Sequence, residues 1–429
     1  MGIELQRVKP FEICSIRPPT ENSSLTFRLT RNCYWNRCAF CPVYKYGARF
    51  SRRDIGEVLE DIRRAKLIDD LMFEHSIGVV SHGGDEFARA DELAAAVERA
   101  CREAGEDGAG RPEMTSADID PRLAWFHSWF KDSPDMTHAF RHVLSWRIAG
   151  GRTCFFGDAD SLILNPDFLR RVIDHVKLSF PSVQRFTVYG RTATAAGKRS
   201  TADLEAFREA GLDRVHFGLE SGCDAVLSLV NKGVSSQEHA EGFLKTREAG
   251  LSCSAYVMPG LGGKSLSEEH AADTARLITR IIPDFVRLRT LEIFPNTPLE
   301  EKAKAGEFIE ADEEQVVREI RTLVEEIDCR TVLMSDSATN LLDVQGRLPE
   351  DRKNMLAEIE RYLGLDARGK LEFSLRSRIS SFYGQYGGLT ADIYREVGPY
   401  LRQEGLDFTR ASDDDLRRGI VVIREKLMP

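Results

Sequence analysis

The sequence of 429 residues has no long hydrophobic run. Its apolar stretches, such as 419–423 and 281–282, fall far short of the roughly 20 residues that a membrane-spanning helix needs. The first residues, 1–7, also lack the apolar segment of a signal peptide. We therefore expect a cytoplasmic protein without a membrane segment.

The chain also lacks a surplus of basic residues, with 59 Lys and Arg against 68 Asp and Glu and a net charge of -9. Because binding to phosphate groups needs a local excess of Lys and Arg, nucleic acid is an unlikely partner on this balance. The composition is 42% hydrophobic and 30% charged, which is typical of a globular protein and excludes disorder of the whole chain.

Paired cysteines are missing as well. Nine cysteines are an odd number, and without a secretion signal they do not predict a disulfide framework. Six of them lie far apart, and we expect each to be a small buried hydrophobic residue. These six are Cys14, Cys101, Cys154, Cys223, Cys253 and Cys329.

The other three cysteines are crowded as Cys33-x4-Cys38-x2-Cys41. The residues between them show neither strand nor helix periodicity, so the pattern predicts a loop that wraps around a metal centre. A structural zinc ion is usually held by four ligands, in two pairs, and the sequence has no matching further ligand pair near these cysteines. A [4Fe-4S] cluster held by three thiolates would keep one iron open for another ligand. A fourth protein ligand, for instance Cys14, would instead indicate a structural metal in a binding or electron-transfer protein.

The triad resembles that of the radical S-adenosylmethionine (radical SAM) superfamily, in which three cysteines follow the first barrel strand and an aromatic residue precedes the third. Phe40 holds that aromatic position, whereas the first gap is four residues here and commonly three in the family. The resemblance implies that Cys33, Cys38 and Cys41 hold a [4Fe-4S] cluster and that Phe40 borders the adenine of S-adenosylmethionine. Reductive cleavage of that cofactor would yield methionine and a 5'-deoxyadenosyl radical, with an electron donor such as flavodoxin or ferredoxin.

Alternating β-branched runs and amphipathic segments predict repeated βα units. We expect an α/β protein: a partial (β/α)6 TIM-like barrel with a helical insertion and a helical C-terminal region. The expected divisions are an arm over 1–24, a core over 25–305 with the insertion at about 69–146, and a mainly helical region over 306–429. The expected strands are 25–30, 153–156, 185–189, 214–219, 253–258 and 285–291, and the expected helices between them start near 54, 166, 201, 236 and 267. In the last region we expect helices at 311–327, 349–362 and 413–427 and an extra strand at 331–334.

Sites on parallel α/β barrels lie at the carboxyl ends of the strands. Gly157, Asp158 and Asp160 follow the second strand, where the family binds the amino group of S-adenosylmethionine, and either aspartate is a candidate. Arg191 follows the third strand and is placed to meet the methionine carboxylate. Each of these charged residues also suits a turn, a cap or a solvated loop.

The stretch 218–222, Gly-Leu-Glu-Ser-Gly, resembles relatives of oxygen-independent coproporphyrinogen oxidase and of the elongator catalytic subunit. The resemblance implies that Glu220 and Ser221 face the ribose or the methionine moiety. Met258 and Gly260 begin a glycine-rich loop after the fifth strand, and such loops permit close approach of the backbone to a ligand. A plain turn is the alternative at that loop.

The insertion contains Gly83-Gly-Asp-Glu-Phe87, the signature of diguanylate cyclases, which we interpret as a coincidence because the insertion is too small for such a domain. Residues 83–86, after an expected strand at 77–80, are a rival for the amino-group motif. We prefer 157–160, because the following segments continue the βα repeat. The aromatic residues of the insertion predict a small helical subdomain, with a substrate lid as the alternative. They are Trp125, Phe126, Trp129, Phe130 and Trp146.

These patterns predict a radical SAM enzyme that abstracts hydrogen from a small-molecule or peptide substrate. The preference for such a substrate rests on missing features: the expected modules for cobalamin, auxiliary clusters and RNA are not recognisable. The alternatives are an RNA-modifying radical SAM enzyme and a non-catalytic metal or iron–sulfur protein. The reaction type is left open, because one fold supports many chemistries.

Overall fold

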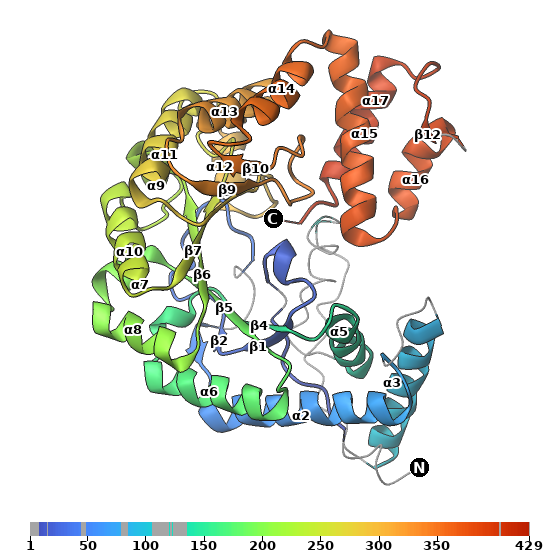
Figure 1. Ribbon diagram of the computed structural model, residues 1–429. Coiled ribbons are helices and arrows are strands. Elements are labelled where there is room, and N and C mark those ends of the chain that lie inside the picture. Colours follow the sequence, from blue (N-terminus) through green and yellow to red (C-terminus); the bar gives the residue numbers. More distant parts are fainter. Residues whose placement is uncertain are drawn as a thin grey trace.

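A single sheet of eight strands organises the computed structural model, which describes residues 8–14, 16–43, 49–78, 85–104, 120, 122, 135–402 and 405–428. The strand order is β1-β4-β5-β6-β7-β8-β9-β10, parallel throughout except for the antiparallel pair of β9 and β10. The strands are β1 Leu25–Arg28, β4 Thr153–Gly157, β5 Arg185–Gly190, β6 Arg214–Glu220, β7 Ser252–Val257, β8 Phe285–Leu288, β9 Thr331–Met334 and β10 Gly346–Leu348. The sheet curves without closing, and helices line its outer side (Figure 1). The predicted fold class, a partial barrel, is confirmed.

Several of the helices between the strands begin at a residue whose side chain caps the helix. Asn165 caps α6, and Ser200 and Ser235 form capping boxes with Asp203 and Glu238 at α8 and α10. The barrel helices are α2 Ile55–Glu74, α6 Pro166–Ser179, α7 Thr192–Gly197, α8 Thr201–Ala210, α9 Asp224–Leu229, α10 Ser236–Glu248, α11 Ser267–Ile281, α12 Pro298–Lys304 and α13 Glu313–Glu326. Helices α3 Asp85–Glu103 and α5 Met136–Ile148 belong to the insertion, and α14 Arg352–Leu363, α15 Ala367–Tyr386, α16 Ala391–Val397 and α17 Asp413–Arg424 follow the sheet. Short elements complete the described chain: η1 Pro19–Glu21, η3 Ser161–Ile163, η4 Gly398–Tyr400, β2 Thr30–Arg31, β3 Ser51–Arg52, β11 Leu401–Arg402 and β12 Gly405–Leu406.

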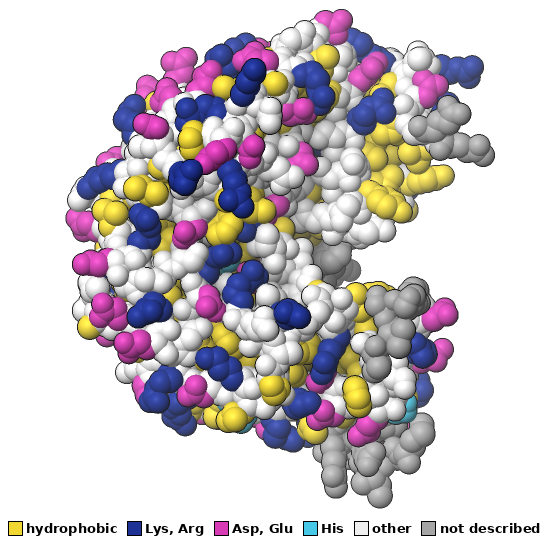
Figure 2. Space-filling view, in the orientation of Figure 1, with side chains coloured by type: hydrophobic (Ala, Val, Ile, Leu, Met, Phe, Trp, Pro, Cys, Tyr) yellow, Lys and Arg dark blue, Asp and Glu magenta, His cyan; other side chains and the backbone are white. Residues whose placement is uncertain are grey.

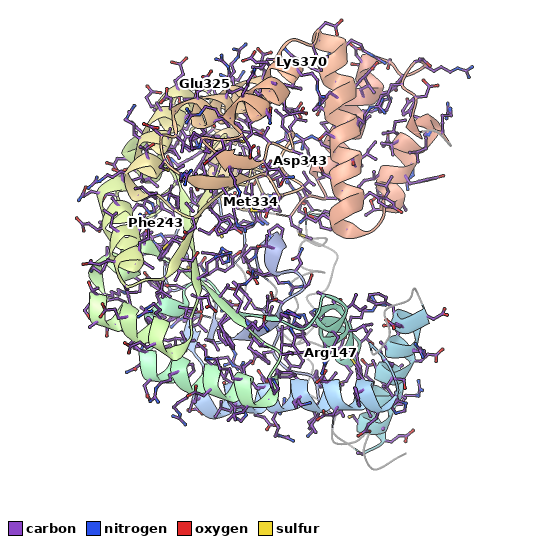
Figure 3. The ribbon with its side chains drawn as sticks, in the orientation of Figure 1. Arg147, Phe243, Glu325, Met334, Asp343 and Lys370 are labelled. Atoms are coloured by element: carbon purple, nitrogen blue, oxygen red, sulfur yellow. The ribbon has the colours of Figure 1, made fainter. Side chains whose placement is uncertain are left out.

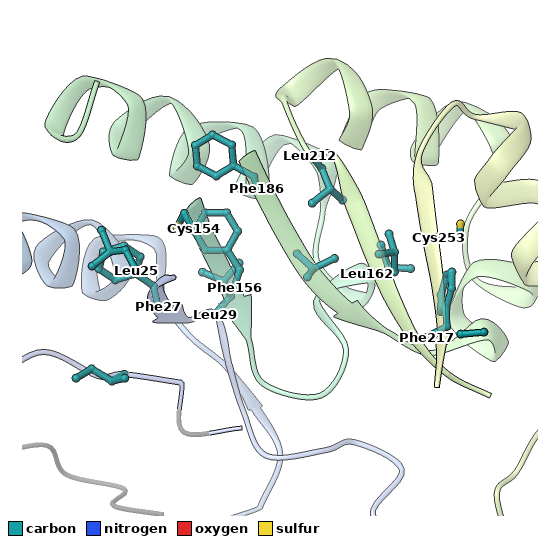
Figure 4. Close-up of a cluster of buried hydrophobic side chains, with 14 of the residues drawn as sticks. Leu25, Phe27, Leu29, Cys154, Phe156, Leu162, Phe186, Leu212, Phe217 and Cys253 are labelled. Carbon is teal, nitrogen blue, oxygen red and sulfur yellow. The ribbon is translucent and has the colours of Figure 1, made fainter. Parts of the chain in front are cut away.

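The main hydrophobic core lies between the sheet and these helices. Figure 4 shows side chains from neighbouring strands, among them Phe27, Phe156, Phe186 and Phe217, packed in this layer. Strand β1 is buried along its whole length, as expected for a parallel strand covered on both faces. The arm before β1 joins the same core through Val8, Phe11 and Ile13.

The predicted strands and helices are found close to their expected bounds. The last expected strand ends early, at Leu288, and the extra strand at 331–334 joins the sheet as its seventh parallel strand. The sheet thus continues beyond 305, and the division into domains stays a prediction. Ser51 lies in β3, and the side chain of Asp54 accepts the hydrogen bond from Gly56 N that caps α2.

The insertion covers the outer edge of β1. His142 of α5 accepts a hydrogen bond from the backbone N–H of Thr26 at 2.9 Å, which occupies a donor that an edge strand would otherwise expose. Trp146 is buried, lies edge-on against Phe180, and donates to the carbonyl of Thr153 at 3.1 Å. Trp146 is therefore a packing residue. The other aromatic residues of the predicted subdomain, at 125, 126, 129 and 130, lie outside the described residues.

Two groups of helices extend from the barrel, α3 with α5 at one end and α15 to α17 at the other (Figure 1). The space-filling view is hollowed between them (Figure 2). Arg147 of α5 pairs with Asp69 of α2, and Lys370 of α15 donates to Glu314 of α13 at 2.8 Å, so each group is tied to a barrel helix (Figure 3). In the part of the chain that is described, no helix is both long and apolar enough to cross a membrane.

Candidate active site

A cavity of about 210 Å³ lies at the carboxyl ends of the parallel strands. Its walls come from the ends of β5, β6 and β7, from the residues after β7 and β8, and from the cysteine loop. The lining residues that were predicted as site residues are Cys33, Cys38, Phe40, Cys41, Arg191, Glu220 and Met258. The fold thus brings together seven side chains that are up to 225 residues apart in sequence. This is the position that parallel α/β barrels use for catalysis.

The cysteine loop is closed at its base by a short antiparallel pair, β2 with β3, in which Thr30 lies opposite Arg52. Asn32, with φ 68°, turns the chain out of β2, a conformation that Asn adopts more easily than most residues. Its backbone N–H donates to Oδ2 of Asp158 at 2.9 Å. Because this carboxylate follows β4, the start of the loop is fixed to the neighbouring strand of the barrel.

Further contacts hold the middle of the loop. The backbone N–H of Ala39 donates to the carbonyl of Val230 at 2.8 Å, and its carbonyl accepts from the N–H of Leu299 at 3.0 Å. The indole N–H of Trp35 donates to the carbonyl of Asn231 at 2.9 Å. A Cβ atom on Gly233 would lie 2.0 Å from the Trp35 ring, so a glycine is required where this ring packs. The loop is held in place by segments that follow β6 and β8.

All three thiols of the loop line the cavity, and none of them forms a disulfide. Among the residues that the structure describes, no three Cys, His, Asp or Glu side chains are arranged to hold a single metal ion. A [4Fe-4S] cluster does not require the three thiolates to converge on one point, because each thiolate binds a different iron. Three soft donors that line one cavity are the kind of donor set that such a cluster takes.

Cys14 does not complete this set of ligands. Its thiol is fully buried behind the cavity, donates to the carbonyl of Ile16 at 2.9 Å, and lies against Gly157. Burial raises the pKa of this thiol well above its usual value, so it is held as a neutral group. Cys154, Cys223 and Cys253 are buried as predicted, and Cys101 and Cys329 are half-buried against the core.

The two aspartates after β4 point away from the cavity, and Ala159 between them is the residue that lines it. Asp158 accepts hydrogen bonds from Nε and Nη2 of Arg28 at 3.1 and 2.7 Å. Asp160 accepts from Thr194 Oγ1 at 2.5 Å and from the backbone N–H of Arg191 at 3.1 Å. Burial raises the pKa of Asp160 to about 6. Both carboxylates therefore have protein partners.

Arg191 directly precedes α7, and its side chain lines the cavity together with the cysteine loop. Its Nη2 donates to the carbonyl of Lys232 at 2.8 Å, and its guanidinium carbon lies 5.2 Å from the centre of the Trp35 ring. Its Nε is buried and has no hydrogen-bond partner among the described residues. A buried donor of this kind is costly unless a ligand accepts from it.

Glu220 ends β6 at an irregularity in the pairing with β7 and has φ 63°, which is unfavourable for a residue with a side chain. Its Oε1 accepts from Nζ of Lys232 at 2.9 Å. Both side chains line the cavity. The strained backbone thus turns a carboxylate toward the cavity, where Lys232 balances its charge.

Ser221 and Gly260 are not part of the cavity wall, and they belong to a buried network behind it. Ser221 Oγ lies 2.8 Å from Nδ1 of His270, whose Nε2 donates to the carbonyl of Met258 at 3.0 Å. Glu319 accepts from the N–H of Gly260 at 2.6 Å. Burial lowers the pKa of His270 to about 4 and raises that of Glu319 to about 7. A neutral His270 thus links the loops that follow β6 and β7.

Sequence reasoning did not select several residues that also line the cavity. They are Ile16, Asn36, Tyr189, Lys232, Tyr256 and Arg289. Tyr256 is buried, and its hydroxyl has no hydrogen-bond partner within the described part of the chain. Tyr189 and Tyr256 lie near the ends of β5 and β7, so their positions could have identified them as residues of the cavity. Nothing in the sequence places Ile16 at the cavity.

The described part of the rival motif at 83–86 does not follow a strand. Asp85 and Glu86 begin helix α3 of the insertion, Ile77 and Gly78 belong to no strand, and residues 79–84 lie outside the described part. The strand beside β1 is β4. The segment that follows the second strand of the sheet is therefore 157–160.

Polar residues after β9 hold the segment that follows this strand in place. Asn340 accepts from the N–H of Thr290 at 2.9 Å and donates to the carbonyl of Leu288 at 2.8 Å. Asp336 pairs with the buried Arg287. These contacts hold the segment after β9 against the end of β8.

Comparison with protein families agrees with this geometry. Residues 132–277 match the family model described as the radical SAM superfamily. The match runs from before α5 into α11 and does not include the cysteines, so the triad and the match are independent observations. About a third of the chain thus matches a radical SAM domain. The protein is an enzyme of the class that uses a [4Fe-4S] cluster and S-adenosylmethionine.

Similar proteins include a tRNA uridine(34) acetyltransferase of Methanocaldococcus infernus, 26% identical over 123 residues, or 28% of this chain and 23% of the relative. The chain thus matches less than a quarter of that protein. Among solved structures, Elp3 of M. infernus is 20% identical with a TM-score of 0.37, over 55% of this chain and 59% of that one. Coproporphyrinogen III oxidase (HemN) of Escherichia coli is 14% identical with a TM-score of 0.31, over 63% and 77% of the two chains.

Proposed function

We propose that Cys33, Cys38 and Cys41 hold the [4Fe-4S] cluster in the cavity described above. The observation that carries this proposal is that the three thiols share one cavity with Arg191 and Glu220 at the carboxyl edge of the sheet. When bound, the cluster and S-adenosylmethionine supply a 5'-deoxyadenosyl radical on one-electron reduction. The chain's part is to hold the donors in place and to surround the radical.

Arg191, Glu220, Phe40 and Met258 form the proposed binding surface for S-adenosylmethionine. The free Nε of Arg191 is a donor for the methionine carboxylate, because a guanidinium and a carboxylate make short, charge-assisted hydrogen bonds. Glu220 offers an acceptor for hydroxyl or amino groups, and Phe40 and Met258 offer apolar contact. Gly157, Asp158, Asp160, Ser221 and Gly260 support this surface from behind.

The substrate in this proposal is a small molecule or a peptide from which hydrogen is abstracted. The support is the acidic balance of the chain, net -9, which disfavours a long nucleic-acid footprint. An RNA-modifying enzyme is the second candidate, and the partial similarity to the tRNA acetyltransferase favours it. Addition of tRNA separates the two, since only an RNA-modifying enzyme forms 5'-deoxyadenosine faster in its presence.

The proposal is tested by anaerobic reconstitution of the wild type and of Cys33→Ser, Cys38→Ser and Cys41→Ser. The wild type is expected to bind about four irons and to form 5'-deoxyadenosine with dithionite, and each variant to lose most of both. Cys329→Ser, half-buried at the core and outside the cavity, is the matched control. A fully loaded wild type that forms no 5'-deoxyadenosine contradicts the proposed catalysis. Tight binding of one zinc ion that depends on Cys14 would indicate a structural metal instead.

A further inference from the structure

The wall of the candidate active-site cavity carries more positive than negative charge. Apart from the cysteines, its charged residues are Arg191, Lys232, Arg289 and the carboxylate Glu220. Glu220 and Lys232 pair with each other at 2.9 Å, so the remaining charges are those of two guanidinium groups. A cavity with an excess of one charge concentrates ligands of the opposite charge. The proposed role of Arg191 accounts for one anionic group, the methionine carboxylate, and makes no use of Arg289.

Tyr256 adds a polar group to the same wall. Its side chain comes from β7, is only 7% exposed, and lines the cavity. Its hydroxyl has no hydrogen-bond partner within the described part of the chain. A buried hydroxyl of this kind costs free energy unless a ligand bonds to it. Burial raises the pKa of Tyr256, so the hydroxyl is neutral and can donate a hydrogen bond.

Arg289 and Tyr256 lie next to each other. The guanidinium carbon of Arg289 is 5.9 Å from the centre of the Tyr256 ring. The backbone N–H of Arg289 donates to the carbonyl of Val257 at 2.9 Å, which holds the end of β8 beside the end of β7. Arg287, two residues earlier, pairs instead with Asp336 and is not part of the wall. The wall therefore brings a cation and a neutral hydroxyl donor together.

We infer that Arg289 and Tyr256 bind a carboxylate group of the substrate. The inference rests on the proposed function, in which Arg191 receives the carboxylate of S-adenosylmethionine, and it adds the chemical class of the substrate. A carboxylate has two oxygens and one negative charge, so one oxygen can accept from the guanidinium and the other from the hydroxyl. No bond forms or breaks in this step, because the two residues only hold the substrate.

A phosphate monoester is the other common anion that a guanidinium binds, and the wall fits it less well. Such a group carries about 1.5 to 2 negative charges at neutral pH and three strong acceptor oxygens. Lys232 is already paired with Glu220, so Arg289 is the one further cation on the described wall. Other lining residues, among them Ile16, Val43 and Met258, are apolar and suit the carbon skeleton of a small carboxylic acid.

The test compares carboxylates with their amides, which have nearly the same shape but no charge. The probes are butyrate, 3-phenylpropionate, the amide of each, and inorganic phosphate. Their dissociation constants are measured by ligand-detected NMR on the reconstituted protein, with and without saturating S-adenosylmethionine. The variants are Tyr256→Phe and Arg289→Gln. The matched control is Tyr362→Phe, at a buried tyrosine of α14 that is not part of the cavity wall.

We expect the wild type to bind at least one carboxylate about tenfold more tightly than its amide, with or without S-adenosylmethionine. Arg289→Gln should abolish this preference, and Tyr256→Phe should weaken carboxylate binding about three- to tenfold. Tyr362→Phe should bind the probes as the wild type does. The hydroxyl of Tyr256 has no partner to lose among the described residues, so Tyr256→Phe should unfold at the same temperature as the wild type or higher. A tyrosine with a purely structural role would lower that temperature.

Equal binding of each carboxylate and its amide overturns the inference, and so does tighter binding of phosphate than of the carboxylates. Displacement of the carboxylate by S-adenosylmethionine also overturns it, because the two residues then bind the methionine moiety. If Arg289→Gln does not fold, the comparison of Tyr256→Phe with Tyr362→Phe decides. Failure of the wild type to form 5'-deoxyadenosine overturns the proposed function, whereas the binding of the probes without S-adenosylmethionine is still measured. The two failures are therefore distinguishable.

Discussion

The aspartates after β4 show how one short stretch serves two different tasks. Asp158 joins Arg28 of β1 to the backbone of Asn32, so it ties the start of the cysteine loop to the sheet. Asp160 accepts from the first turn of α7 and so fixes the segment that carries Arg191. Each carboxylate positions a residue at the cavity without lining the cavity itself.

The stability contribution of Asp160 is expected to depend on pH. Burial raises its pKa to about 6 from an ordinary 3.8, so the folded protein holds this proton more tightly than the unfolded chain. Stability therefore falls as pH rises from about 4 to about 6. The stability of Asp160→Asn does not fall in this way, because an amide does not titrate. Its amide oxygen still accepts from the Arg191 N–H, and its NH2 can donate to the Thr194 hydroxyl.

Relative to wild type, Asp160→Asn should gain about 1–2 kcal/mol between pH 4.5 and pH 7. The free energy of unfolding is measured with urea on the cluster-free proteins at both pH values. The variant Asp328→Asn, at an exposed aspartate, is the control. A stability difference that does not change with pH would show that Asp160 does not titrate in this range.

At the scale of elements, contacts with other segments set the conformation of the cysteine loop. Its base is paired by β2 and β3, its middle is bonded to Val230 and Leu299, and Trp35 packs on Gly233. These partners come from segments after β6 and β8. The ligand geometry of the three cysteines therefore depends on the completed barrel.

Gly233→Ala should disturb cluster loading. Gly233 has φ +67°, and an added Cβ would lie 2.0 Å from the Trp35 ring, so the ring and the loop must move. We expect less than half of the wild-type iron after reconstitution, with unchanged far-UV circular dichroism. Gly197→Ala, at the end of α7 with nothing within 4 Å of the new Cβ, is the matched control and should load normally.

A double mutant separates the steric cause from other effects. Trp35→Ala removes the ring that the new methyl group meets, so Gly233→Ala should cost little additional iron in that background. Additive losses in the double mutant would mean that the glycine acts through its backbone conformation and not through Trp35.

At the scale of the whole molecule, the buried Glu292 after β8 joins several regions. Its carboxylate accepts from Nε and Nη2 of Arg424 in α17 at 3.1 and 3.0 Å. Arg122 of the insertion and Arg378 of α15 lie at 3.6 and 3.9 Å from the same carboxylate. A single buried acid thus receives cations from the insertion and from the C-terminal helices.

Arg424→Ala should loosen the C-terminal helices from the barrel. It removes the two closest donors of Glu292 but leaves Arg122 and Arg378 nearby, so the expected loss is about 2 kcal/mol, below that of an isolated buried pair. Limited proteolysis should cut the chain faster near α15 to α17. Arg417→Ala on the same helix, where the pairs are exposed, should behave as wild type. Equal protease resistance of both variants would contradict a role for this network.

Much of the fold could be predicted because its signals are local. Helix α10, expected to start near 236 and found at Ser236–Glu248, is set by a capping box and an apolar face within its own residues. Helices α15 and α16 were missed. Over α15 the apolar residues have no clear helical periodicity, and contacts with α17 supply the missing stabilisation.

The sequence by itself determined the cysteine triad, the order of the parallel strands along the chain, and the edge of the sheet at which the site forms. These follow from residue spacing and from the rule that sites lie at the carboxyl ends of parallel strands. Only the tertiary structure decided which neighbours face the cavity: Ala159 and not Asp158 or Asp160, and Glu220 and not Ser221. The reason is that such side-chain directions are set by distant partners. Arg28, Thr194 and His270 hold the other side chains behind the wall, and they lie 130, 34 and 49 residues away in sequence.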